Sequence, residues 1–151
     1  PVRRTTQGGL VVGGESRHAG EAWQSGQVML SWEDVVTDSG NPFDGCNLVI
    51  HEFAHCLDGL DGEMGGSLTF GDSVTTRWWD EVCDSEFAAL ARAAERNQKT
   101  LLDHYGATNH AEFFAVASET FFEKPRQLKL EHPELFGLLL KYFRLDPINW
   151  T

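Results

Sequence analysis

The sequence contains few cysteines and no long hydrophobic run. Its three cysteines, Cys46, Cys56 and Cys83, leave an odd thiol if any two of them pair, so we expect a protein of the reducing cytoplasm without a disulfide framework. The two most apolar stretches, 46–60 and 111–122, are interrupted by histidine, glutamate or aspartate and fall short of the roughly 18 apolar residues of a membrane span. The composition therefore excludes a membrane-spanning helix in this sequence, and we expect no membrane partner.

Positive charge is also scarce. The chain has 12 lysines and arginines against 23 aspartates and glutamates, a formal net charge of −11. Such a surface repels a phosphate backbone unless the basic residues gather on one face, so nucleic acid is not an expected ligand. The length of 151 residues and the 41% of hydrophobic residues predict one globular domain over 1–151, and we expect a monomer.

Clusters of glycine separate the expected elements of secondary structure. Residues 10–12 and 27–32 have the composition of strands, and in the second strand Val28, Leu30 and Trp32 share one face. Three later segments have the apolar period and the end signals of helices: 74–97, 110–124 and 133–144. This order predicts an α+β fold, with a small front sheet packed on a helical core.

Residues 45–57 are apolar on nearly every side and predict a buried helix, with Asp44 as its N-cap and Gly59 as its stop signal. The polar residues in and just after this segment recur at steps of four, four and three and form one stripe: Asn47, His51, His55 and Asp58. We expect this stripe to line a cleft.

The same segment contains the pattern His-Glu-x-x-His, at His51, Glu52 and His55. Two imidazoles four residues apart project from the same side of a helix and can hold one Zn²⁺ ion. Glu52 is rotated by about 100° from His51, so it flanks the metal without competing for it. From there its carboxylate can take the proton of a water whose pKa the metal lowers toward about 7, which is hydrolytic chemistry.

The same spacing can arise by chance from two core histidines and a surface glutamate. In this helix, however, most other residues are Leu, Val, Ile, Phe or Ala, so the three polar side chains would be buried. Because burial of an unpaired charge costs several kcal/mol, we favour a metal site. A purely structural zinc site would need a fourth protein ligand, and no residue stands at a suitable spacing.

A catalytic zinc ion needs a third protein ligand besides the two histidines. In metzincins this ligand is a histidine six residues after the second histidine of the motif, and a glycine lies three residues after that second histidine. Here those two positions hold Asp61 and Asp58. Both aspartates are better interpreted as partners of the liganding histidines or as turn-forming residues.

A glutamate on a later helix is the other candidate for the third ligand. Glu112 and Glu119 are seven residues apart, so they lie nearly on one face of the predicted helix 110–124. Glu112 could instead complete a capping box with Asn109. Glu119 could instead accept a hydrogen bond from the ring of a liganding histidine. The spacing alone leaves both alternatives open.

Several stretches carry a family resemblance: Asn47-Leu48-Val49-Ile50-His51-Glu52-Phe53-Ala54-His55, Leu57-Asp58, Tyr105-Gly106-Ala107-Thr108-Asn109 and Ala111-Glu112-Phe113-Phe114-Ala115-Val116-Ala117-Ser118-Glu119. Together they resemble the Mlc titration factor A family of zinc peptidases. Further agreement at 20–23 and 28–32 extends the resemblance over about residues 20–147.

The resemblance implies a gluzincin-type, zincin-like metalloprotease core in which His51, His55 and Glu112 hold one Zn²⁺ ion per chain. It also implies that Glu52 is the general base and that Tyr105 is the proton donor or oxyanion stabiliser, a role that suits a neutral phenol beside a developing negative charge. Members of the family carry a mainly helical region before the first strand, and no part of this sequence corresponds to it.

These observations predict a cytoplasmic zinc-dependent peptidase, with aminopeptidase action as one form, that cleaves a peptide or protein substrate. The strand at 28–32 is the expected docking edge for an extended peptide. The alternative is a regulatory interaction protein that sequesters a transcriptional repressor, as the family name suggests, with peptidase activity secondary. The net charge of −11 would suit a basic partner surface.

Overall fold

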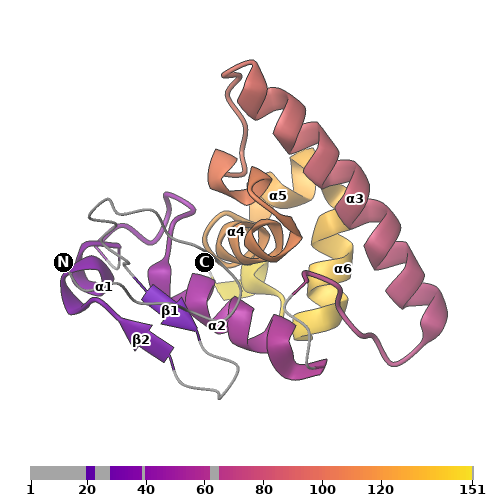
Figure 1. The fold of residues 1–151 in the computed structure, drawn as a ribbon, viewed down its shortest axis with the longest axis horizontal. Coiled ribbons are helices and arrows are strands. Elements are labelled where there is room, and N and C mark those ends of the chain that lie inside the picture. The colour runs from indigo at the N-terminus through magenta and orange to yellow at the C-terminus, as the bar shows by residue number, and fades with distance from the viewer. Residues whose placement is uncertain (1–19, 23–27, 39, 62–64, 151) are drawn as a thin grey trace, which may run out of the picture.

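The computed structural model describes residues 20–22, 28–38, 40–61 and 65–150, and the expected strand at 10–12 lies outside these ranges. The described chain forms one hairpin followed by helices (Figure 1). In chain order the elements are β1 (Gly20–Ala22), β2 (Val28–Leu30), α1 (Trp32–Asp38), α2 (Leu48–Asp58), the 3-10 turn η1 (Gly59–Asp61), α3 (Ser73–Glu95), η2 (His104–Ala107), α4 (His110–Glu123), α5 (Pro125–Glu131), α6 (Pro133–Phe143) and η3 (Pro147–Trp150).

The second strand is shorter than the sequence predicts. It ends at Leu30, and Trp32 begins helix α1 instead of extending the strand. The cause is Ser31, whose carbonyl oxygen accepts the N–H of Val35 at 3.0 Å and whose hydroxyl oxygen accepts the N–H of Asp34 at 3.4 Å, as at a helix N-cap. Trp32 is 78% exposed and therefore does not belong to an inward face of the sheet.

Helix α4 lies at the centre of the core. Every residue from 113 to 121 is buried, and α2, α3, α5 and α6 all pack on it; Figure 1 shows α4 near the middle of the molecule, seen along its axis. Asn109 caps its start by accepting the N–H of Glu112 at 2.9 Å. The helix ends before Pro125, as predicted, and Pro125 then opens α5, an additional helix that the sequence pattern did not predict.

Helix α2 begins three residues later than predicted and is only partly buried. Asn47 is its N-cap, because the Asn47 side chain accepts the N–H of Ile50 at 3.1 Å, whereas Asp44 accepts the N–H of Cys46 in the preceding turn. One side of α2 packs on α4 and on the β1–β2 hairpin, and Phe53 on another side is 55% exposed. The expectation of a buried site helix is therefore wrong in part, since the central buried helix is α4.

Helices dominate this α+β arrangement, since the sheet in the described ranges is a single antiparallel hairpin of two three-residue strands. The predicted helices 74–97 and 133–144 correspond to α3 and α6 within two residues at each end, which confirms both. Among the described helices, none is both long and apolar enough to cross a lipid bilayer. The candidate functional site lies where α2 contacts α4.

Candidate metal centre

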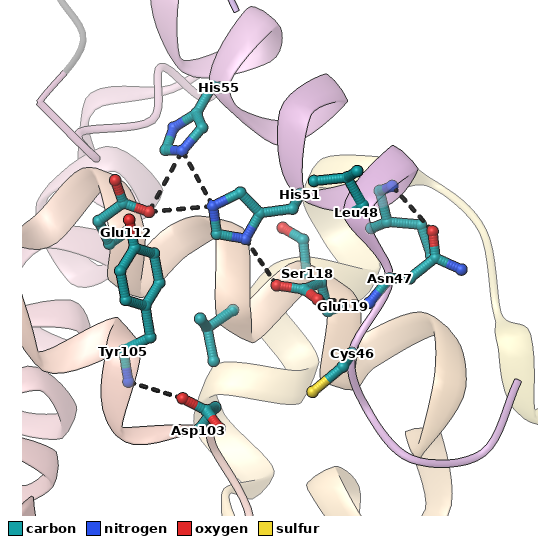
Figure 2. A network of polar contacts seen from close by, with 12 residues as sticks. Cys46, Asn47, Leu48, His51, His55, Asp103, Tyr105, Glu112, Ser118 and Glu119 are labelled. Carbon is teal, nitrogen blue, oxygen red and sulfur yellow. Dashed lines mark hydrogen bonds and ion pairs between the residues drawn. The ribbon is translucent and has the colours of Figure 1, made fainter. Parts of the chain in front are cut away.

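Helices α2 and α4 bring together two histidines and one glutamate. His51 and His55 lie one turn apart on α2, with their Nε2 atoms 3.2 Å from each other. Glu112, in the first turn of α4, places its Oε2 atom 3.0 Å from Nε2 of His51 and 3.3 Å from Nε2 of His55 (Figure 2). In the part of the chain that the structure describes, this is the only group of three or more histidine, cysteine or acidic side chains that could hold a metal ion.

The spacing of these three atoms fits a single metal ion. In a tetrahedral site with bonds of about 2.0 Å to nitrogen and oxygen, neighbouring ligand atoms lie roughly 3.3 Å apart, and the observed separations are 3.0 to 3.3 Å. Three electron-rich atoms this close repel one another unless a proton or a cation lies between them. Imidazole nitrogen and carboxylate oxygen are also ligands that zinc accepts.

His51 has a second acidic partner behind its ring. Its Nδ1 atom lies 2.7 Å from Oε1 of Glu119, which is also on α4. A carboxylate only accepts hydrogen bonds, so Nδ1 of His51 carries a proton, and this N–H donates a hydrogen bond to Glu119. The structure thus places the two candidate glutamates differently: Glu112 beside both histidines, and Glu119 behind one of them. Asn109 caps the backbone of Glu112, but the Glu112 carboxylate faces the histidines.

The acidic partners change the protonation of this group. Burial lowers the pKa of His51, but hydrogen bonds to Glu112 and Glu119 outweigh burial and raise that pKa to about 9. Burial raises the pKa of Glu112, but its hydrogen bonds with His51 and His55 outweigh burial and lower that pKa to about 2. Without a metal, a proton on His51 therefore satisfies the negative charge of Glu112, and a metal ion has to displace it.

The two ends of the predicted polar stripe on α2 do not face Glu112. Asn47 serves as the N-cap, and its side chain also donates to Oε1 of Glu123 at 2.9 Å. Asp58, at the other end, is 1% exposed and accepts the N–H of Gly66 through Oδ1 at 2.7 Å. Asn47 thus contacts the acidic side chains of α4 but not Glu112, and the stripe does not continue as a cleft lining at its other end, because Asp58 is buried.

Glu123 is a partner that the sequence argument missed. Its Oε2 atom accepts the N–H of Gly45 at 2.9 Å, so it anchors the segment that leads into α2. Glu112, Glu119 and Glu123 follow one another at steps of seven and four, which is the spacing of one helix face. That stripe of three acids, on a helix otherwise rich in phenylalanine and alanine, is the signal that would have revealed it.

Tyr105 and Glu52 lie beside this group. Tyr105 belongs to η2, where Asp103 accepts its backbone N–H at 2.7 Å, and its ring centroid is 5.8 Å from that of His51. Burial, together with the negative charges of Glu112 and Glu52, raises the pKa of Tyr105, so its phenol stays protonated at neutral pH. Glu52 is 6% exposed on α2.

Asp61, the residue at the metzincin position, is the last residue of η1. The three cysteines are unpaired, with Cys46 exposed, Cys56 half-buried and Cys83 buried.

Comparison with known proteins agrees with this chemistry. The family model of the glucose-regulated metallo-peptidase M90 matches residues 1–144 of the chain. The chain belongs to this family. Membership makes it a metallopeptidase-like protein, in keeping with a candidate metal site made of His51, His55 and Glu112.

Curated relatives of this M90 family member come from Synechocystis and from Yersinia. The uncharacterized protein slr2042 of Synechocystis sp. is 42% identical over 146 residues, which are 95% of this chain and 53% of that protein. Mlc titration factor A of Yersinia pestis and of Yersinia pseudotuberculosis is 32% identical over 144 residues, 93% of this chain and 52% of each relative. These relatives confirm the resemblance to the Mlc titration factor A family. The chain spans about half the length of the curated relatives that it matches.

Proposed function

We propose that this chain is a cytoplasmic zinc-dependent peptidase with a gluzincin-type, zincin-like core, in which His51, His55 and Glu112 hold one Zn²⁺ ion. The observation that carries the proposal is the convergence of their three ligand atoms at 3.0 to 3.3 Å, in a chain of a metallopeptidase family. When bound, the ion supplies Lewis-acid polarisation of the scissile carbonyl and of the attacking water.

Glu52 is the general base in this proposal. It follows His51 directly and is rotated from it by about 100° on the helix, so its carboxylate is not one of the three ligands. Glu52 takes a proton from the attacking water and returns it to the amine of the departing peptide. Glu52 is only 6% exposed, so its carboxylate lies in a low-dielectric environment, where its hydrogen bonds are stronger than in water.

Tyr105 stabilises the negative charge that develops on the carbonyl oxygen during attack. Its raised pKa keeps the phenol neutral and able to donate a hydrogen bond. Tyr105 is 54% exposed and its ring centroid lies 5.8 Å from that of His51, so the residue is accessible to a substrate beside the metal site.

The substrate is a peptide or a protein segment in extended form. Strand β2 pairs with β1 along one edge, and no strand among the described residues pairs with its other edge. An extended peptide could add to this edge by backbone hydrogen bonds, since β2 lies against α2, the helix that carries both histidines and Glu52.

Replacement of Glu52 by glutamine tests the proposal. The amide cannot take a proton, so we expect Glu52→Gln to keep its zinc and to lose at least about 10²-fold in turnover of a fluorogenic peptide library. Glu134→Gln is the matched control, because Glu134 is an exposed glutamate in the first turn of α6. Cleavage by Glu52→Gln at the rate of the parent would show that Glu52 is not the base.

A second function is favoured by the relatives that are named Mlc titration factor A. We propose as the alternative that the protein sequesters a transcriptional repressor, with its net charge of −11 suited to a basic surface on that partner. Retention of a purified repressor by metal-free protein and by Glu52→Gln, at the affinity of the parent, would support binding as a role separate from hydrolysis. Loss of binding on metal removal would contradict that separation.

A further inference from the structure

Glu119 makes two contacts that belong to different parts of α2. Its Oε1 atom accepts the Nδ1–H of His51 at 2.7 Å, and its Oε2 atom accepts the backbone N–H of Asn47 at 2.5 Å. Asn47 is the N-cap of α2, and His51 lies one turn further along the same helix. Glu119 is 6% exposed, so water competes little for either contact. Figure 2 shows the carboxylate between the His51 ring and the start of the helix.

We propose that Glu119 is a positioning residue of the metal centre, holding the ring of His51 and the start of α2 with one carboxylate. This inference rests on the proposed metal site. The hydrogen bond to Nδ1 directs Nε2 of His51 toward Glu112, and the bond to Asn47 fixes where α2 begins and thus the direction of its histidine face. Glu112 and Glu119 belong to one buried helix, so α4 sets the distance between His51 and Glu112.

The position of His55 depends on Glu119 indirectly, through helix α2. Its Nδ1 atom is buried and has no hydrogen-bond partner within the described ranges, so no contact of its second nitrogen fixes this ring. The position of His55 depends on the placement of α2 as a whole. By holding the N-cap, Glu119 acts on His55 through the helix and on His51 directly.

Glutamine at position 119 cannot accept both hydrogen bonds. A carboxylate accepts two hydrogen bonds from two N–H donors, one on each oxygen, whereas an amide offers one oxygen and one NH₂ group. In Glu119→Gln, either the His51 ring or the Asn47 N–H faces an NH₂ donor. Loss of such an outer contact to a metal-binding histidine typically lowers metal affinity by about 10- to 100-fold.

Glu123 provides a matched control on the same helix. It is also buried, and its carboxylate also accepts two N–H donors, the backbone of Gly45 and the side chain of Asn47. It therefore anchors the same segment but does not contact either histidine. Glu123→Gln loses one acceptor in the same way as Glu119→Gln, so the two variants should lose similar stability and differ in metal affinity.

The experiment measures Zn²⁺ affinity of the metal-free proteins by competition with a chromophoric chelator, together with the visible absorption bands of bound Co²⁺ and urea unfolding without metal. We expect Glu119→Gln to bind Zn²⁺ about 10- to 100-fold more weakly than the parent and to change the Co²⁺ bands. Glu123→Gln keeps the hydrogen bond between Glu119 and the His51 ring, so it should lose clearly less affinity than Glu119→Gln and keep the bands of the parent. Should Glu119→Gln fail to fold, Glu119→Asp, which is too short to keep both contacts, is expected to show the same loss.

The outcomes separate this inference from the proposed function. A parent protein that binds no Zn²⁺ would overturn both. A parent that binds Zn²⁺ while Glu119→Gln matches the affinity and Co²⁺ bands of Glu123→Gln would overturn the positioning role of Glu119 alone.

Discussion

Replacement of Gly66 by alanine is expected to lower stability and metal affinity together. Gly66 has a positive φ of +74°, and it joins three parts of the fold. Its N–H donates to Asp58 at the end of α2, and its carbonyl oxygen accepts the indole N–H of Trp79 in α3 at 2.9 Å. A Cβ atom at this position would lie 2.3 Å from the carbonyl oxygen of His110, the first residue of α4.

The size of the effect follows from these contacts. An alanine at positive φ costs about 1 kcal/mol relative to glycine. An ordinary Cβ contact is at least 3.4 Å, so the 2.3 Å approach requires the loop or the start of α4 to move by about 1 Å. Because the obstructing atom is backbone, the movement costs about 1 to 3 kcal/mol more. The total is about 2 to 4 kcal/mol, or roughly 5 to 15 °C in Tm for a chain of this length.

The same movement reaches the candidate site. Glu112 lies two residues after His110, and a displacement of about 1 Å would take its carboxylate out of position relative to the two histidines. We expect Gly66→Ala to bind Zn²⁺ more weakly than the parent, measured by chelator competition, in addition to its lower midpoint of urea unfolding.

Gly65→Ala is the matched control, because a Cβ atom at Gly65 meets nothing within 4 Å and the backbone there does not have a positive φ. It should unfold and bind metal as the parent does. If Gly66→Ala unfolds at the urea concentration of Gly65→Ala, the packing of this loop on α4 does not have the role assigned to it.

Three further predictions concern the site and one remote ion pair. Tyr105→Phe should lower kcat by about 10²- to 10³-fold with unchanged Zn²⁺ affinity, since it removes the donor to the oxyanion; an unchanged kcat would contradict this role. Zn²⁺ binding near pH 7 should release about one proton, because the pKa of His51 is raised to about 9, and affinity should increase with pH up to that value. Calorimetric heats that do not depend on the ionisation enthalpy of the buffer would argue against this exchange. The hydrogen bond to Glu86 raises the pKa of His132, so the pair stabilises the fold below the unfolded-state pKa of His132 and loses this effect as pH rises through the folded-state value. His132→Ala should therefore cost about 0.5 to 1 kcal/mol more at acidic than at alkaline pH, and an equal cost at both would refute it.

The elements with strong local signals could be predicted from the sequence. Asn109 and Pro125 bound α4, and a long amphipathic pattern accounts for α3. The His-Glu-x-x-His pattern placed His51 and His55 on one face of a helix, and the helix did form there. Each of these signals comes from residues close together in the chain, so it can be recognised in the sequence.

Other features depend on contacts that a sequence does not show. Helix α1 spans seven residues and buries none of them, so its apolar residues Trp32, Val35 and Val36 cover about one turn, which is too short a pattern to identify a helix. Asp44 and Asn47 are both suitable N-cap residues for α2. Asn47 is the N-cap in the structure, where it also contacts Glu119 and Glu123 of α4, more than 70 residues away in the chain. The different positions of Glu112 and Glu119 likewise follow from how α4 lies against α2.

The most direct test of the account is the zinc content of the purified protein and of two variants after exposure to excess Zn²⁺ and gel filtration. We expect about one ion per chain in the parent, loss of the ion in Glu112→Ala, and retention with weaker affinity in Glu119→Ala. A parent without bound zinc would contradict the metal centre. Stoichiometric zinc in Glu112→Ala with none in Glu119→Ala would contradict the assignment of Glu112 as the third ligand.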